Sequence, residues 1–146
     1  MALSVFTLAL TLFLGGDDLR TSAGAPLSLP ELLARGPVVL VFWNSWLPRA
    51  NEFAKLLPEI EAAAEQHGWS GAVVVFQERR SDAEHDVPRL AGPLPYAFDR
   101  RGDLLRRFQV TRAPAVLLVE RNGAVRARCG PDPAAVHAII REMAHR

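Results

Sequence analysis

The chain has 146 residues, of which 49% are hydrophobic and 23% are charged, and this composition is typical of one globular domain and excludes a disordered chain. Its 17 basic and 16 acidic side chains nearly cancel, so a net charge of +1 gives no electrostatic reason to expect nucleic-acid binding. The arginines are scattered among acidic residues, which is typical of a solvated surface rather than a phosphate-binding patch.

Cys129 is the one cysteine in the sequence. A disulfide within the chain, a two-cysteine redox cycle and a cysteine-rich zinc site are therefore excluded. The four histidines lack the spacing of a metal site, and the sequence has no glycine-rich phosphate loop. We expect neither a metal ion nor a cofactor.

The first residues have two interpretations. Residues 1–16 carry no charged side chain. The apolar stretch 5–14 is too short for a typical transmembrane helix and has the length of the apolar part of a signal peptide, although no Lys or Arg precedes it. The same residues alternate with period two, as in a strand. Residues 1–16 are therefore either an export signal or membrane-associated segment of an extracytoplasmic protein, or an additional strand of a cytoplasmic one. A single domain follows over residues 17–146.

Three elements are predicted in the first part of this domain. Residues 19–21 and 26–29 flank small residues and predict an N-terminal hairpin. Residues 29–35 have a helical pattern that ends at a Gly-Pro pair. The apolar run 38–43 has no polar side chain on either face, as in a strand that is covered on both sides.

A helix and a second buried strand come next. The apolar residues between positions 49–66 share one helical face and predict a helix, in which Pro58 predicts a kink because proline removes a backbone donor. Residues 72–76 are a second apolar run and predict a strand. Residues 77–95 are polar and rich in proline, which predicts mostly loop, and residues 104–108 predict a helical turn.

The last part of the sequence predicts a strand, a tight turn, a strand and a helix. Residues 115–120 are a third apolar run, and Asn122-Gly123 predicts a hairpin turn into a strand over 125–129. An amphipathic helix is predicted over 133–145. The order of all these elements predicts an α/β fold with a mixed central β-sheet flanked by helices.

Two loops of this predicted fold carry a family resemblance. Residues 42–50, Phe-Trp-Asn-Ser-Trp-Leu-Pro-Arg-Ala, resemble the active-site segment of thioredoxin-like proteins of the TlpA and ResA type, whose pattern is Phe-Trp-Ala-Thr-Trp-Cys-Pro-Pro-Cys. Residues 110–114, Val-Thr-Arg-Ala-Pro, are similar to the family's cis-proline loop, and the turns at 98–102 and 120–123 also match. The resemblance implies a thioredoxin-like fold in which the peptide bond before Pro114 is cis.

The chain departs from this family at its catalytic positions. The resemblance places Leu47 where the family has its attacking cysteine and Ala50 where it has the resolving cysteine. Thiol–disulfide exchange requires a thiolate, and neither side chain can ionise or bond to sulfur. Ser45 is the nearest hydroxyl, but no histidine lies close to it in the sequence. The sequence therefore favours a thioredoxin-like protein without exchange activity, and not an enzyme.

The resemblance also implies a groove beside the active-site turn. The family's cis-proline loop presents backbone groups there, and an extended peptide can pair with them like an added strand. The groove would be lined by Trp46, Pro48, Arg49, Ala113 and Pro114. We therefore expect a binding or accessory module whose partner is an extended peptide or a protein, and no nucleic acid.

Cys129 supports an alternative function. Val125, Ala127 and Cys129 are predicted on one strand face, and Arg126 and Arg128 on the other. A free cysteine is usually a small buried hydrophobe, whereas a thiol beside arginines can be reactive. The alternative is thus a residual thiol oxidoreductase or peroxidase-like enzyme that uses Cys129 or a partner's thiol. A further alternative is a subunit that joins a membrane complex through its outer surface or its apolar N-terminal segment.

Overall fold

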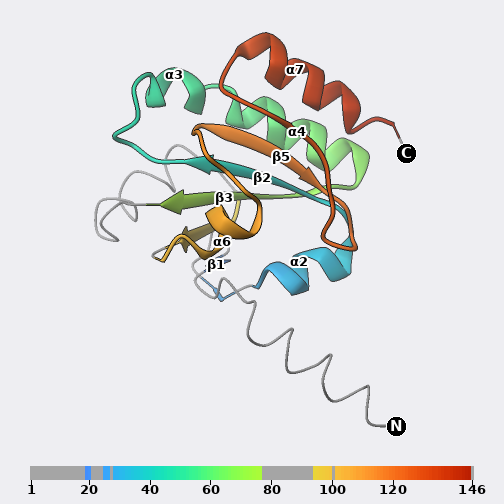
Figure 1. Ribbon diagram of the computed structural model, residues 1–146. Coiled ribbons are helices and arrows are strands. Elements are labelled where there is room, and N and C mark those ends of the chain that lie inside the picture. Colours follow the sequence, from blue (N-terminus) through green and yellow to red (C-terminus); the bar gives the residue numbers. More distant parts are fainter. Residues whose placement is uncertain (1–18, 21–24, 27, 77–93, 100, 146) are drawn as a thin grey trace, which may run out of the picture.

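A six-stranded mixed β-sheet organises the described part of the chain, with helices on both of its faces (Figure 1). The computed structural model describes residues 19–20, 25–26, 28–76, 94–99 and 101–145. The strands lie in the order β1-β4-β3-β2-β5-β6. Their bounds are β1 Leu19–Arg20, β2 Val38–Trp43, β3 Ser70–Phe76, β4 Tyr96–Asp99, β5 Ala115–Val119 and β6 Val125–Cys129.

Strand β2 lies in the interior of the sheet and has both of its faces buried. It pairs in parallel with β3 and antiparallel with β5. Its alternate side chains enter two hydrophobic cores: Val41 belongs to the core on one face and Leu40 to the core on the other, each at most 1% exposed. A strand that is buried on both faces needs a continuous apolar run, which is why residues 38–43 contain no polar residue.

Helices cover the two faces unequally. Figure 1 shows α3, α4 and α7 on one side of the sheet and α2 and α6 on the other. Their bounds are α2 Leu29–Arg35, α3 Ala50–Ala54, α4 Leu57–His67, α6 Asp103–Arg107 and α7 Pro133–Glu142. The expected α/β architecture, a mixed sheet flanked by helices, is therefore confirmed.

Local capping explains where two of the helices begin. Ser28 and Glu31 form a reciprocal capping box at α2, in which each side chain accepts a hydrogen bond from the other's backbone N–H at 3.2 Å. Asp132 caps α7 by accepting from the backbone N–H of Ala135 at 3.2 Å.

The predicted long helix over 49–66 is two helices. Helix α3 ends at Ala54, and α4 begins at Leu57 with Pro58 in its first turn. Proline lacks a backbone N–H, so it fits the first turn of a helix and not its interior. The expected kink is consequently a complete break.

Three further differences concern strands. Tyr96–Asp99 forms β4, for which sequence analysis predicted no strand, and β3 begins at Ser70, two residues earlier than expected. Leu29 belongs to α2, so the second arm of the expected hairpin is shorter, and Pro26 forms only an isolated bridge. The turn of that hairpin lies outside the described residues, and β1 pairs antiparallel with β4.

The predicted faces of β6 are right for Ala127, Arg128 and Cys129 but wrong for Val125, because the β5–β6 pair has an irregularity. Val119 pairs with Val125 while Leu118 pairs with Ala127, so Arg126 is an extra residue on β6. An extra residue turns the residues before it to the opposite face. Val125 therefore packs with one core, and Ala127 and Cys129 with the other.

Residues 1–16, and residues 77–93 of the loop predicted over 77–95, lie outside the described residues. Within the described ranges, no helix is both long and apolar enough to span a bilayer. Both interpretations of the N-terminal segment therefore stand as predictions.

Candidate functional site

A fully buried asparagine holds the turn that follows β2. The Nδ2 group of Asn44 donates to the backbone oxygen of Phe76 at the end of β3, at 3.2 Å. Its Oδ1 atom accepts from the backbone N–H of Leu47 at 3.1 Å. One side chain thus joins the ends of two adjacent strands and orients the loop between β2 and α3, which carries the predicted site.

The two positions that the resemblance assigns to cysteines are occupied by packed apolar side chains. Leu47 is half-buried and contacts both cores. Ala50 is 4% exposed and begins α3, and its carbonyl accepts a hydrogen bond from the indole N–H of Trp43 at 3.1 Å. Neither side chain offers a nucleophile or an ionisable group at this turn.

Arg49 gives the turn a backbone conformation that is unusual for an L-residue. Its φ is 61° and its ψ is 22°, in the left-handed region. A proline, which the family pattern has at this position, could not adopt a positive φ. The guanidinium of Arg49 pairs with Glu52 at 2.9 Å, and both side chains are exposed.

The structure brings three of the five predicted groove residues together. The peptide bond between Ala113 and Pro114 is cis, as the resemblance implies. Pro48, Arg49 and Pro114 line one groove of about 350 Å³. The remaining lining residues are Glu52, Phe53, Leu56, Pro131, Asp132 and Pro133. The groove therefore lies between the start of α3, the cis-proline loop and the start of α7.

The other two predicted residues lie outside this groove. Trp46 is the one large hydrophobic side chain of the described residues that is strongly exposed, at 55%, and its ring meets Phe76 edge to face with 6.5 Å between the ring centroids. Ala113 is half-buried against the core.

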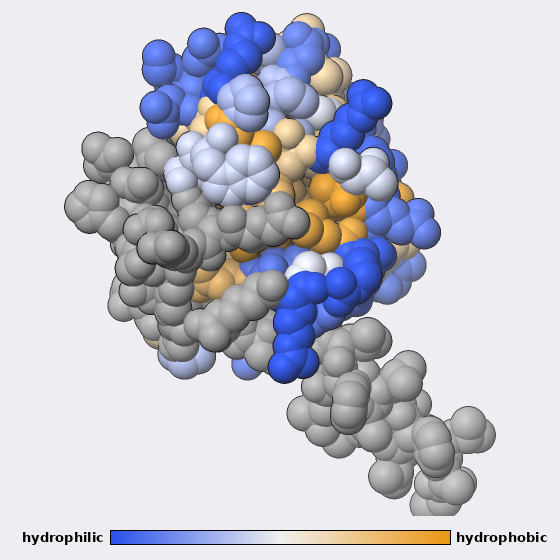
Figure 2. Space-filling model, turned by 60° about the vertical axis from the view of Figure 1, so that its left-hand side comes forward, coloured by the Kyte–Doolittle hydropathy of each residue, from blue (hydrophilic) through white to orange (hydrophobic). Residues whose placement is uncertain are grey.

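Figure 2 shows the face of the molecule at this end of the sheet. Hydrophobic surface lies in the middle of this face and is bordered by hydrophilic side chains.

Sequence analysis missed most of the groove's far wall. Pro131, Asp132 and Pro133 belong to the loop that begins α7, and they are more than 80 positions from Pro48 in the sequence. Their proline content could have marked them as a rigid surface, but only tertiary packing brings them to Pro114. Asn44 was also missed as a structural residue, and its signal was a lone polar residue directly after a buried strand.

Cys129 lies in a half-buried position that disfavours a thiolate. The pKa of its thiol is raised to about 11, mainly by burial; a hydrogen bond with the backbone of Val116 opposes this rise and the nearby Asp132 carboxylate adds to it. Arg126 bonds to Glu120, Glu142 and the carbonyl of His145, and Arg128 donates to the carbonyl of Gln109. Both arginines that could have activated the thiol are directed to other partners.

No group of three or more His, Cys, Asp or Glu side chains within the described ranges could hold a metal ion. The histidine at position 137 pairs instead with Glu59, at 2.7 Å between its Nε2 and the Oε2 of the carboxylate.

Comparisons with known proteins identify the fold. No protein-family model and no curated protein matches the chain. Among solved structures, it is similar to a putative thiol:disulfide interchange protein DsbE from Chlorobium tepidum, with a TM-score of 0.72 and 23% identity over 88% of this chain and 94% of that one. It is also similar to a secreted Mycobacterium tuberculosis disulfide oxidoreductase homologous to Escherichia coli DsbE, with a TM-score of 0.68 and 21% identity over the same shares of the two chains.

A third similar structure is the thioredoxin domain of a thiol-disulfide oxidoreductase from Bacteroides vulgatus, with a TM-score of 0.68 and 15% identity over 86% of this chain and 90% of that one. All three identities are below a quarter, so the likeness establishes the fold and not the activity. The chain has a thioredoxin-like fold, as the resemblance of residues 42–50 and 110–114 led us to expect.

Removal of the Asn44 side chain should loosen the turn. In Asn44→Ala, the carbonyl of Phe76 and the N–H of Leu47 lose their partner, so we expect the free energy of unfolding to fall by about 3 kcal/mol. Urea unfolding measures this change. The control is Asn122→Ala, which removes an exposed asparagine with one backbone contact and should cost under about 1 kcal/mol. Equal losses in the two variants would contradict the role of Asn44.

The Cys129 thiol should react slowly with alkylating agents. A rise of its pKa from 9.0 to about 11 leaves about 100-fold less thiolate at pH 8 in the folded than in the unfolded protein. The rate of iodoacetamide labelling, measured against pH with and without urea, should show this difference. A labelling midpoint near or below pH 9 in the folded protein would contradict it.

Proposed function

We propose that this chain is a thioredoxin-like binding or accessory module that takes an extended peptide or protein segment and does not carry out thiol–disulfide exchange. One observation carries the proposal: packed Leu47 and Ala50 occupy the positions of both cysteines, while the groove beside them remains open. Loss of the nucleophile removes the chemistry, whereas the shape that could hold a substrate does not depend on sulfur.

The groove has the chemistry of a site for an extended peptide. Its walls are mainly proline rings and the apolar side chains of Phe53 and Leu56. Arg112 and Ala113 do not line the groove themselves but directly precede Pro114, which does; within the described part of the chain their backbones bond to no other backbone group, so they can pair with an added strand. Apolar walls beside unpaired backbone groups suit a segment that offers alternating side chains and its own backbone.

The charges at the groove are largely balanced. Arg49 pairs with Glu52, and Asp132 is engaged in capping α7. The groove therefore favours a partner segment through shape and apolar contact more than through charge.

An extracytoplasmic location is part of this proposal. It is supported by the apolar residues 1–16 and by the secreted M. tuberculosis protein of similar fold. Fractionation of cells that express the tagged full sequence tests it, and recovery in the cytosol alone would count against it.

We expect no redox turnover by this protein. Neither insulin-disulfide reduction nor peroxide consumption should exceed the rate without protein, because the thiol of Cys129 stays protonated near neutral pH. The assay compares the unchanged protein with Cys129→Ser. Turnover that disappears in Cys129→Ser would replace the proposal with the alternative, a residual oxidoreductase that uses this thiol.

Peptide binding should depend on the groove. Calorimetry with a panel of unfolded and extended peptides should identify binders. We expect Arg49→Ala and Leu56→Ala each to weaken their binding by about tenfold, because contact area in the groove is lost. The control is Arg141→Ala, an exposed change on α7 that does not line the groove. A panel without binders, or equal affinities in all variants, would refute groove binding.

A further inference from the structure

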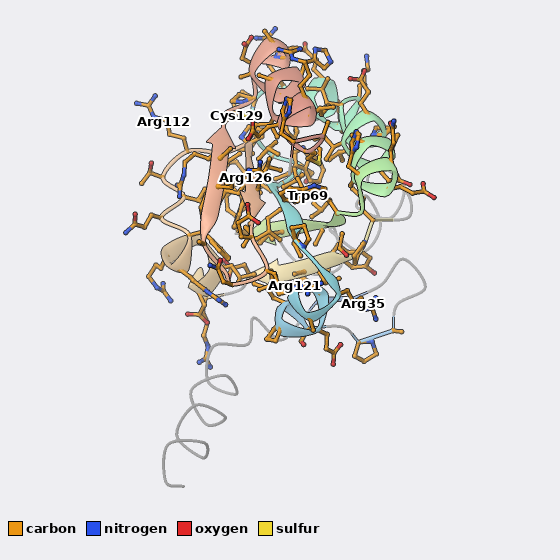
Figure 3. All side chains as sticks on the ribbon, turned by 90° about the vertical axis from the view of Figure 1, so that its right-hand side faces the viewer. Arg35, Trp69, Arg112, Arg121, Arg126 and Cys129 are labelled. Atoms are coloured by element: carbon orange, nitrogen blue, oxygen red, sulfur yellow. The ribbon has the colours of Figure 1, made fainter. Side chains whose placement is uncertain are left out.

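A second depression lies at the opposite end of β2 from the groove. Its volume is about 650 Å³, and its lining includes Arg35, Trp69, Glu120, Arg121 and Arg126. Figure 3 shows the three arginines and Trp69 on one side of the molecule. Arg35 ends α2, Trp69 directly precedes β3, Arg121 lies in the turn after β5, and Arg126 belongs to β6. Three cations from three separate elements thus gather where sequence analysis expected only a scattered, solvated surface.

The single acid among the described residues that line this depression is already neutralised. Glu120 lies 3.6 Å from the guanidinium of Arg126. Arg126 also pairs with Glu142 at 3.3 Å and donates to the carbonyl of His145 at 2.6 Å, so its position is fixed by three partners. Arg126 and the two carboxylates together carry a net charge of −1, of which Glu120 lines the depression and Glu142 does not.

Arg35 and Arg121 have no such partner. Within the described part of the chain, neither guanidinium forms an ion pair, and the one contact of Arg121 is a 3.4 Å hydrogen bond to the carbonyl oxygen of Arg35. Both side chains are exposed. This bond holds the Arg121 guanidinium against the end of α2, beside the residue that carries the other unpaired charge.

Helix ends do not account for the excess charge. The C-terminal ends of α2 and α4 border the depression at Gly36 and Gly68, and each contributes about half a negative charge at most. Two full positive charges exceed this, and the seven residues of α2 make its dipole small. The side chains that line the depression, three arginines and Glu120, therefore keep a net charge of about +1 after both helix ends are counted, and Glu142, which pairs with Arg126, lies outside this lining.

We propose that this depression binds the phosphate group of a phosphomonoester or of inorganic phosphate. Arginine presents a planar fork of N–H donors that matches phosphate oxygens, and forks from two elements can hold one tetrahedral dianion from different directions. A planar carboxylate uses fewer of these directions. The depression is also larger than a phosphate group, which leaves room for the rest of a monoester. The site is independent of the peptide groove.

Calorimetric titration of the full chain at low salt tests this proposal. The probes are inorganic phosphate, phenyl phosphate and succinate. We expect both phosphates to bind more tightly than succinate, and Arg35→Gln and Arg121→Gln each to weaken phosphate binding by about tenfold, since a charge-assisted hydrogen bond is lost. Arg112→Gln is the matched control, because this exposed arginine lies away from the depression (Figure 3). At a phosphate concentration near the Kd of the unchanged protein, phosphate should raise the melting temperature of the unchanged protein and of Arg112→Gln. The melting temperatures of Arg35→Gln and Arg121→Gln should change little.

The outcomes separate the two sources of phosphate. Phenyl phosphate that binds at least as tightly as inorganic phosphate identifies a monoester, and binding of inorganic phosphate alone identifies the free ion. Affinities that are equal in all variants, tighter binding of succinate, or no heat of binding with any probe would overturn the proposal. If the two arginines served only to stabilise the end of α2, their variants would melt lower and bind phosphate unchanged, which also overturns it.

Discussion

Burial of both faces of β2 is the constraint on which the remaining structure depends. Its side chains alternate between two hydrophobic cores, so helices must cover the sheet on both sides. The strand can then leave the core only at its ends, and the turn after Trp43 emerges at one edge of the sheet. Asn44 satisfies the polar groups at that exit, by bonding to the carbonyl of Phe76 and the N–H of Leu47. The loop of the candidate site is rigid for this reason.

The same turn shows that a thioredoxin-like fold can be held together at this point without cysteine side chains. Exchange needs a thiolate at a defined point, whereas the turn needs only packing and hydrogen bonds. Leu47 and Ala50 supply packing, and Trp43 bonds to the carbonyl of Ala50. The groove is built by proline rings and apolar side chains from three elements, none of which depends on sulfur. The shape of the groove therefore does not require the cysteines on which exchange depends.

The two ends of the sheet differ in charge. At the groove, Arg49 and Glu52 pair, and Asp132 caps α7. At the other end, Arg126 neutralises Glu120, and Arg35 and Arg121 remain unpaired. A net charge of +1 for the whole chain conceals this local excess, because net charge averages over surfaces that ligands meet separately.

The sequence by itself determined the class of fold, a disturbance of the helix near Pro58, which it predicted as a kink and not as a break, and the absence of thiols at positions 47 and 50, because buried strands, helix breakers and missing thiols are local properties of the chain. It missed β4, whose four residues carry too short a pattern, and it placed Val125 on the wrong face of β6, because a single extra residue at Arg126 reverses the face of the residue before it. Only the tertiary structure decided that Pro131 and Pro114 line the same groove and that Arg121 bonds to Arg35. Such contacts join residues that are distant in the sequence, so they depend on how the elements pack and leave no periodic signal in the sequence.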